Sequence, residues 1–214
     1  MEAHHRNVSV RLLAADLTDW YLKDVLMDCQ QTTVKEIVVL PATIRRAKQL
    51  AQTSDIQIGG VIDYPLAQGT TAKVAFEIGR AFMDGADFLE VWLPASLLLH
   101  NSRGFEELIE TIRSLTLTGG EIRLALQTES MNELTKIQVA QQLKAQNWPS
   151  VVLGQETPLA DAIHDVTLFA LDGGDQLMIQ SNPEAIDGAA YDQLAAAGAS
   201  KVSIPFTAYD AFFA

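Results

Sequence analysis

The chain has 214 residues, of which 48% are hydrophobic, and its formal net charge is −12. A chain of this length buries roughly 70% of its unfolded surface, so we expect residues 1–214 to form a single domain with a large core. The acidic excess argues against nucleic acid and anionic membrane surfaces as partners, because both repel a negatively charged protein.

Cys29 is the single cysteine, which excludes a disulfide or a cysteine-based metal site within one chain. It lies in an apolar helical pattern, and we expect a buried, unreactive thiol. The N-terminal segment MEAHHRN lacks the apolar core of a signal peptide, and no stretch reaches the roughly 18 apolar residues of a membrane span. We therefore expect a soluble, cytoplasmic protein with no membrane contact.

Short apolar runs alternate with helical patterns from one end of the chain to the other. The runs expected to form strands are Val8–Leu13, Glu36–Leu40, Ile56–Ile62, Phe88–Leu93, Ile122–Gln127, Ser150–Leu153, Gln176–Ile179 and Lys201–Ile204. Helical patterns cover Thr18–Gln31, Ala42–Gln52, Thr71–Asp84, Phe105–Leu115, Met131–Gln146, Pro158–Ala170 and Ala189–Ala197, with a short helix from Thr207. Continuous apolar runs are typical of parallel strands that are covered on both faces. Eight strands, each followed by a helix, predict the α/β class and a small (β/α)8 TIM barrel.

Three segments resemble the deoxyribose-phosphate aldolase family, whose members are class I, Schiff-base aldolases. The segments are Leu17–Ile44 (LTDWYLKDVLMDCQQTTVKEIVVLPATI), Ile58–Glu77 (IGGVIDYPLAQGTTAKVAFE) and Gly85–Pro94 (GADFLEVWLP). They resemble the family's first helix and second strand, its VIGFPLG-type turn with a threonine-capped helix, and its GADE-x-D-x-V strand. The resemblance implies a TIM barrel and an aldolase ancestry, and the last third of the chain matches it mainly in spacing.

The family's reactive positions are changed in this chain. The resemblance implies that its Schiff-base lysine falls on Val152, its second lysine on Gln180 and its proton-relay aspartate on Glu90. Schiff-base chemistry requires an amine, because the carbon skeleton must be held as an iminium. The family's phosphate turns fall on Asn182–Glu184 and Ser203–Phe206, where prolines offer no backbone donor. We therefore expect a divergent member in which Schiff-base chemistry and phosphate binding are lost.

One of the seven lysines approaches the C-terminal ends of the expected strands, where barrel active sites lie. This residue is Lys73, in the first turn of the helix after the third strand. Four others lie in outer helices, and Lys35 and Lys201 precede or open strands at the opposite face. Nothing near Lys73 indicates the burial or the cationic neighbour that lowers a lysine pKa.

The expected strand ends and the loops that follow them carry acidic and amide side chains. They are Asp63, Glu90, Gln127, Glu129, Gln155, Gln180 and Asn182. Such a set repels a sugar phosphate and suits a neutral polyol, an amine or a divalent cation. We predict Glu90 as the candidate catalytic residue, with Lys73 as a remote second. Substrate contacts are expected from Asp63, Gln127, Gln155 and Gln180.

Structural alternatives stand beside these assignments. Glu90 can instead form a buried ion pair with Arg11 or Arg123, because buried charges are rarely left unpaired. Asp63 can instead cap a turn. Asp63, Glu90 and Glu129 have no spacing that supports a metal site, and we expect neither a metal nor a cofactor.

Three functions fit the sequence. The first is a non-catalytic relative that binds a small unphosphorylated metabolite or a partner protein. The second is a lyase or isomerase of changed chemistry that uses Glu90, with a metal or water. The third is an aldolase with an unrecognised amine such as Lys73. A homodimer is possible through outer side chains, with Trp20, Tyr21 and Phe105 as candidate contacts.

Overall fold

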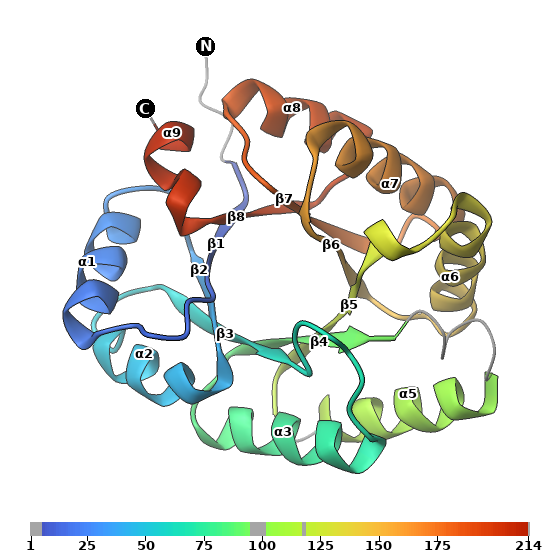
Figure 1. Ribbon diagram of the computed structural model, residues 1–214, viewed down its shortest axis with the longest axis horizontal. Coiled ribbons are helices and arrows are strands. Elements are labelled where there is room, and N and C mark those ends of the chain that lie inside the picture. Colours follow the sequence, from blue (N-terminus) through green and yellow to red (C-terminus); the bar gives the residue numbers. More distant parts are fainter. Residues whose placement is uncertain (1–5, 95–101, 117–118, 214) are drawn as a thin grey trace.

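The computed structural model describes residues 6–94, 102–116 and 119–213. Its strands are β1 (Val8–Leu12), β2 (Glu36–Val39), β3 (Gln57–Ile62), β4 (Phe88–Leu93), β5 (Glu121–Leu126), β6 (Ser150–Thr157), β7 (Met178–Pro183) and β8 (Lys201–Pro205). They pair in parallel and in chain order into a closed barrel, with β1 joined to β8 (Figure 1). The expected (β/α)8 TIM barrel is confirmed.

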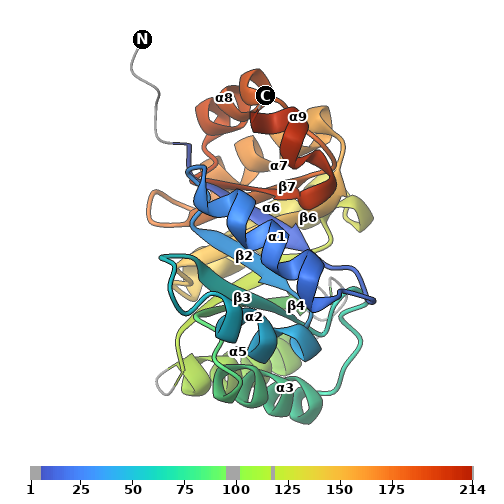
Figure 2. The same cartoon turned by 90° about the vertical axis from the view of Figure 1, so that its left-hand side faces the viewer.

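Helices follow the strands and cover the outside of the barrel (Figures 1 and 2). They are α1 (Asp19–Gln30), α2 (Ile44–Leu50), α3 (Thr71–Met83), α5 (Ser102–Thr116), α6 (Glu133–Ala145), α7 (Leu159–Asp172), α8 (Gly188–Ala197) and α9 (Tyr209–Phe213). Short 3-10 turns lie at Pro41–Thr43, Thr128–Ser130 and Phe206–Ala208. Within the described ranges, no helix combines the length and the apolar character needed to cross a bilayer.

Side-chain caps explain where several helices begin. Thr18 and Thr70 each accept a hydrogen bond from the backbone N–H three residues on, and Asn132 and Asp187 do the same for α6 and α8. Such a bond satisfies one of the free donors of the first turn. The threonine-capped helix that the sequence predicts from Thr71 is therefore confirmed.

Two strands differ from their predicted bounds by more than one residue at an end. The seventh strand was expected over Gln176–Ile179, but β7 covers Met178–Pro183. The sixth was expected to end at Leu153, but β6 continues to Thr157 with an irregular register after Leu153. In both cases the added residues are polar or small and several of them are buried, so an apolar run does not reveal them.

The barrel has two apolar clusters. The larger one lies between strands and helices and includes Cys29, which is fully buried as expected, with a pKa raised to about 12 by that burial. The smaller one is the inner apolar cluster, which comprises Val38, Val61, Ala67, Phe88, Trp92, Ala125 and Val152. Side chains of a strand alternate between faces, so these residues fill the interior that the outer cluster leaves.

Candidate functional site

Val152, on which the resemblance places the family's Schiff-base lysine, has a side chain that is fully buried in the inner apolar cluster. In the strand register, Val152 pairs with Ala125 of β5 on one side and with Gln180 of β7 on the other. An ammonium group at this point would be surrounded mainly by hydrocarbon, and its charged form would be strongly disfavoured. The position is built for packing.

All seven lysines lie in the described part of the chain, so their locations can be compared directly. Lys73 has a side chain that is 58% exposed, and its Nζ lies 2.5 Å from Oδ1 of Asp63. The hydrogen bond that Lys73 donates to Asp63 raises the pKa of Lys73, which keeps the amine protonated and poorly nucleophilic. Lys48 and Lys136 are paired with Asp87 and Asp165 on the outside of the barrel.

Lys201 is the lysine that enters the barrel, and it does so at the N-terminal end of β8. Its Nζ bonds to Glu36, which also accepts two hydrogen bonds from Arg123 at 2.7 and 3.0 Å. Burial, and then the charge of Arg123, lower the pKa of Lys201. The sequence placed Lys201 at this opposite face, but its burial was not anticipated.

Glu90 lies in the middle of the barrel with no exposed surface. Its Oε1 accepts a hydrogen bond of 2.7 Å from Nε2 of Gln180. Burial raises the pKa of Glu90, although the bond from Gln180 and the charges of Arg123 and Arg11 act in the opposite direction. Burial is the largest of these effects, so the pKa of Glu90 lies above its ordinary value.

The ion pair that was the alternative for Glu90 is not formed among the described residues. Arg123 pairs instead with Glu36 and Glu121, each at 2.7 Å. Arg11 donates to the backbone carbonyls of Ser203 and Pro183. Both arginines are therefore held by other acceptors, and the ion-pair interpretation of Glu90 is wrong.

Five buried polar atoms of the inner wall have no hydrogen-bond partner within the described ranges. They are Oγ of Ser9, Oε2 of Glu90, Nε1 of Trp92, Nδ2 of Asn182 and Oγ of Ser203. Buried polar atoms are nearly always hydrogen-bonded to protein or to ordered water. This group, which we call the inner polar set, therefore has no partner among the described residues, and ordered water or a bound molecule would supply one.

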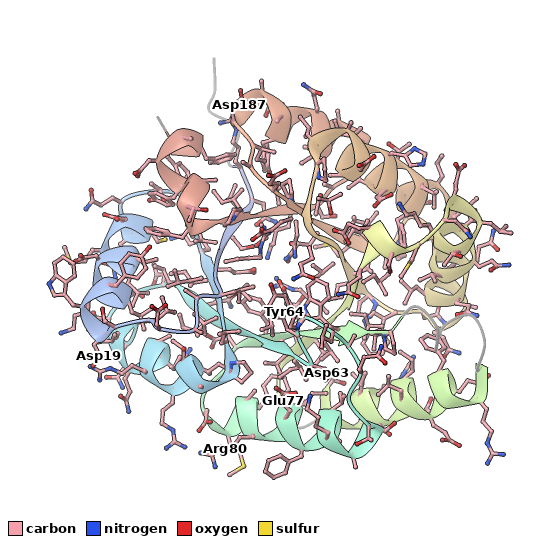
Figure 3. The ribbon with its side chains drawn as sticks, in the orientation of Figure 1. Asp19, Asp63, Tyr64, Glu77, Arg80 and Asp187 are labelled. Carbon is pink, nitrogen blue, oxygen red and sulfur yellow. The ribbon has the colours of Figure 1, made fainter. Side chains whose placement is uncertain are left out.

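The loop between β3 and α3, residues 63–70, folds across the C-terminal end of the barrel. Its Tyr64 ring packs edge-on against Trp92, with centroids 5.3 Å apart, and Ala67 is fully buried in the inner apolar cluster. Figure 3 shows Tyr64 toward the centre of the ring of strands, with Asp63 between it and α3, which carries Glu77. The loop thus covers the inner polar set from this end.

The side chains that were predicted to bind substrate divide into two groups. Asp63, Gln127 and Gln155 hold the covering loop. Asp63 accepts bonds from the Gly69 N–H at 2.6 Å and from Lys73, while its own N–H donates to Glu77. Nε2 of Gln127 donates to the Pro65 carbonyl at 2.5 Å, and Nε2 of Gln155 donates to the Tyr64 hydroxyl at 2.9 Å.

Gln180 belongs instead to the interior with Glu90. Its carbonyl oxygen accepts from Arg123 at 3.1 Å, and its Nε2 also reaches Oδ1 of Asn182 at 3.0 Å. Gln180 therefore connects the charged N-terminal end of the barrel to the inner polar set. Glu129 accepts bonds from Gln155 N–H and the Thr157 hydroxyl, both at 2.5 Å.

Sequence reasoning missed Ser9 and Ser203, which face each other in the register of β1 and β8. It also missed the role of Tyr64. A usable signal existed for the serines, because each alternates with apolar residues that pack in the outer cluster. No pattern along the chain indicated that the loop would fold inward.

The region that corresponds to a phosphate turn has few free donors. The Glu184 N–H donates to the Thr157 carbonyl at 2.9 Å, and the Pro183 carbonyl accepts from Arg11. Pro205 has no N–H. Phosphate sites need several convergent N–H groups, Arg or Lys. Arg11 lies at this point, but its guanidinium already donates to the carbonyls of Ser203 and Pro183.

Among the described residues, no group of three His, Cys, Asp or Glu side chains is placed to hold a metal ion. Asp63 and Glu129 are engaged in separate loop contacts, and Glu90 lies deeper in the barrel. The metal site considered from the sequence therefore has no ligand set in the described structure.

No family model matches the chain. Individual curated relatives do, and those compared here are deoxyribose-phosphate aldolases. The enzyme from Coprothermobacter proteolyticus is 27% identical over 126 residues, which cover 56% of this chain and 54% of that protein. The enzyme from Carboxydothermus hydrogenoformans is 30% identical over 104 residues, covering 49% and 45%. The chain thus spans about half the length of these relatives.

A longer match joins the chain to deoxyribose-phosphate aldolase from Lactococcus lactis, 22% identical over 175 residues that cover 80% of this chain and 78% of that protein. Solved structures share the fold. QR15, an aldolase, superposes with a TM-score of 0.82 at 14% identity, covering 95% of this chain and 92% of that one. The tetrameric deoxyribose-phosphate aldolase from Aeropyrum pernix gives 0.80 at 15% identity, covering 92% and 84%. The resemblance inferred from the sequence is confirmed.

Proposed function

We propose that this relative of the deoxyribose-phosphate aldolases has lost Schiff-base chemistry and binds a small, unphosphorylated, uncharged molecule inside its barrel. The observation that carries the proposal is the inner polar set, whose five buried atoms lack partners among the described residues. A small hydroxylated molecule would supply those partners. The ligand would lie beneath the loop of residues 63–70.

The loss of Schiff-base chemistry rests on the lysines. Val152 replaces the amine within hydrocarbon, and Gln180 replaces the second lysine with an amide that is already bonded to Glu90 and Arg123. Lys73 carries a raised pKa beside Asp63. An iminium requires a neutral amine that reaches the carbonyl carbon, and neither arrangement provides one near Glu90.

The chemistry of the inner polar set favours an uncharged polyol. Two serine hydroxyls can donate and accept, the Asn182 amide and the Trp92 indole can donate, and the Glu90 carboxyl can do either when protonated. A phosphate would be a poor ligand, because the equivalent of the phosphate turn offers prolines and an occupied Glu184 N–H. A short chain of hydroxyl groups matches this mixture best.

The binding experiment measures thermal shifts and ligand-observed NMR with glycerol, erythritol and deoxyribose, each compared with deoxyribose phosphate. We expect stabilisation by at least one unphosphorylated compound and none by the phosphate. Asn182→Leu should abolish the response. Gln142→Leu is the matched control, because Oε1 of Gln142 is also unpartnered but lies on α6, outside the barrel.

Two results would contradict the proposal. One is equal or tighter binding of deoxyribose phosphate. The other is no response to any polyol, together with a crystal structure in which ordered water completes all five atoms.

A second function is favoured by one observation, the buried Glu90 carboxyl with its raised pKa. A carboxyl group with a raised pKa can act as a general acid, as in a lyase or isomerase of changed chemistry. Turnover of a bound polyol or sugar by the wild type, abolished in Glu90→Gln while binding is retained, would support this function over simple binding.

A further inference from the structure

A hollow with a volume of about 140 Å³ opens at the N-terminal end of the barrel, where β5 to β8 begin (Figure 1). The first residues of these four strands line it, and they are Glu121, Ser150, Met178 and Lys201. Three buried side chains also line it, and they are Glu36, Arg123 and Gln180. The hollow therefore lies at the end of the barrel opposite the loop of residues 63–70, and its walls are rich in charge.

The buried charges around this hollow do not cancel. The side chains of Glu36, Arg123 and Lys201 are 9%, 6% and 12% exposed. One carboxylate and two cations leave this buried group with a single positive charge. The second carboxylate, that of Glu121, is 50% exposed, so water screens its charge. A positive hollow in a chain of net charge −12 favours a negatively charged ligand.

Lys201 is the cation of this group that has hydrogen-bonding capacity left. An ammonium carries three N–H donors, and Glu36 is the one acceptor that Lys201 has among the described residues. Arg123 differs, because all five of its N–H groups donate to oxygens of neighbouring side chains. The pKa of Lys201 is lowered by burial and then by the charge of Arg123, as expected where the positive charge is incompletely compensated.

Two serine hydroxyls line the hollow together with Lys201. Oγ of Ser150 lies 3.5 Å from the Ile122 carbonyl, at the outer limit of a hydrogen bond. Oγ of Ser200 accepts from the Ile179 N–H at 3.3 Å, and its own O–H has no acceptor within the described ranges. The free groups are therefore mainly donors, and a carboxylate, which only accepts, matches them.

The remaining wall of the hollow is apolar. It is formed by Val151, Ile179 and Met178, and Met178 is 53% exposed. A hydrocarbon chain attached to the carboxylate would cover apolar surface here, and such burial is favourable. A halide ion has no apolar part and would leave this wall uncovered. The small volume restricts the hydrocarbon to a short chain.

We propose that this hollow binds a short-chain aliphatic monocarboxylate of the size of propionate. The carboxylate accepts hydrogen bonds from Lys201 and from the hydroxyls of Ser150 and Ser200, and the hydrocarbon lies against Met178 and Ile179. Residues at this end of a TIM barrel ordinarily serve stability, so the proposal adds a binding role to the charged network. The site is separate from the ligand proposed for the inner polar set, and neither proposal depends on the other.

The test is a titration of the full chain with propionate at constant ionic strength. Thermal shift and saturation-transfer NMR of the propionate protons report binding. Propionamide and propylammonium have nearly the same size, but the first is neutral and the second is positively charged. We expect saturable stabilisation by propionate and none by propionamide, propylammonium or chloride.

Met178→Glu is the sharpest variant, because it changes the half-exposed rim and leaves the buried network in place. A further negative charge beside the carboxylate should weaken propionate binding at least about tenfold. Met178→Gln is the matched control of similar length without charge, and it should bind within about threefold of the wild type. Leu171→Glu adds the same charge at a side chain of α7 that is 78% exposed, and it should bind as the wild type does.

Lys201→Met should abolish the response to propionate, whereas Lys201→Arg, which keeps the charge, should retain it. Circular dichroism shows whether each variant is folded, and Met178→Glu decides the question if Lys201→Met does not fold. The proposal is overturned if the wild type gives no saturable response to propionate, or if propionamide or chloride stabilises it equally. Unchanged propionate binding in folded Met178→Glu would overturn it as well.

Discussion

The N-terminal end and the middle of the barrel interior treat buried charge differently. At the N-terminal end, Arg123 donates to Glu36 and Glu121, and Lys201 also donates to Glu36. In the middle, Glu90 has one hydrogen bond and one oxygen with no partner among the described residues, and four other buried polar atoms of the inner wall also lack partners there. A satisfied network stabilises the fold, whereas an unsatisfied one indicates an absent partner.

The same comparison shows why Lys201 resembles a reactive lysine although it belongs to the structural network. Lys201 combines burial, a lowered pKa and a cationic neighbour, which are features of reactive lysines. Its amine is nevertheless held by Glu36 at the end of the barrel away from the mouth, where residues of this fold serve stability. Location and partners, rather than pKa alone, assign it to the structural network.

The largest expected effect comes from breaking the satisfied network. Arg123→Met leaves Glu36 buried with Lys201 as its remaining partner, and removal of one member of a buried pair costs about 3–5 kcal/mol. Urea unfolding measures this loss. Arg103→Met is the control, since its pair with Glu107 is largely exposed, and it should change stability by less than about 0.5 kcal/mol. If Arg123→Met lowered the free energy of unfolding by less than about 1 kcal/mol, the network would not stabilise the fold as described.

Val152→Lys places an ammonium in the inner apolar cluster, and we expect it to lower stability by about 2–4 kcal/mol, as burial of an unpaired charge does. Val152→Met, of similar length but uncharged, separates the effect of charge from that of size. The lysine variant should not cleave deoxyribose phosphate, because the donors of a phosphate site are also lacking. Measurable cleavage in an aldolase assay would contradict this description of the site.

Glu90→Gln and Glu36→Gln should respond to pH with opposite signs. The pKa of Glu90 is raised, so the folded state holds the proton more tightly than the unfolded state does. The stability that Glu90 contributes to the wild type therefore falls as the pH rises above the unfolded pKa of about 4.3. Glutamine cannot ionise, so Glu90→Gln should gain stability relative to the wild type as the pH rises through this window.

Glu36 shows the reverse. Burial opposes its ionisation, but Arg123 and Lys201 outweigh that effect and lower its pKa. The stability that it contributes is present above the unfolded pKa and is lost as the pH falls through the folded pKa. Glu36→Gln should therefore lose stability relative to the wild type as the pH rises. Denaturation at several pH values measures the stability of each variant relative to the wild type. If this difference changed with pH in the same direction for both variants, the distinction between the two regions would be wrong.

The smallest expected effect is that of Lys73→Met. The Lys73 side chain is 58% exposed, and exposed ion pairs contribute about 0.2–1 kcal/mol. The variant should unfold within about 1 kcal/mol of the wild type and should bind polyols unchanged. A complete loss of binding or of any residual turnover would give Lys73 the functional role that its protonated state argues against.

The barrel could be predicted because its signals are local. Apolar runs and helical patterns follow each other in a strict order, and Thr18 and Thr70 cap their helices through bonds to residues three positions away. The polar extensions of β6 and β7 could not be predicted in this way. Their residues are buried by other strands, and Gln180 and Asn182 read as loop residues until the closed barrel surrounds them.

The candidate site was predictable in identity but not in arrangement. The resemblance located Glu90, Val152 and Gln180, and the structure brings all three into the interior. Whether Asp63, Gln127 and Gln155 would face a ligand or a loop depends on where residues 63–70 fold. That choice rests on the contacts of Tyr64 and Ala67 with the interior, which are distant in sequence.

The central claim is tested most directly by chemical trapping of the wild-type protein. The protein is incubated with acetaldehyde or deoxyribose phosphate, reduced with borohydride, and measured by intact mass and peptide mapping. The account predicts no selective adduct, with any labelling spread over exposed lysines and equal in a Lys73→Met sample apart from that residue. A stoichiometric adduct on one lysine, Lys73 or Lys201 above all, would contradict the claim and return the chain to Schiff-base chemistry.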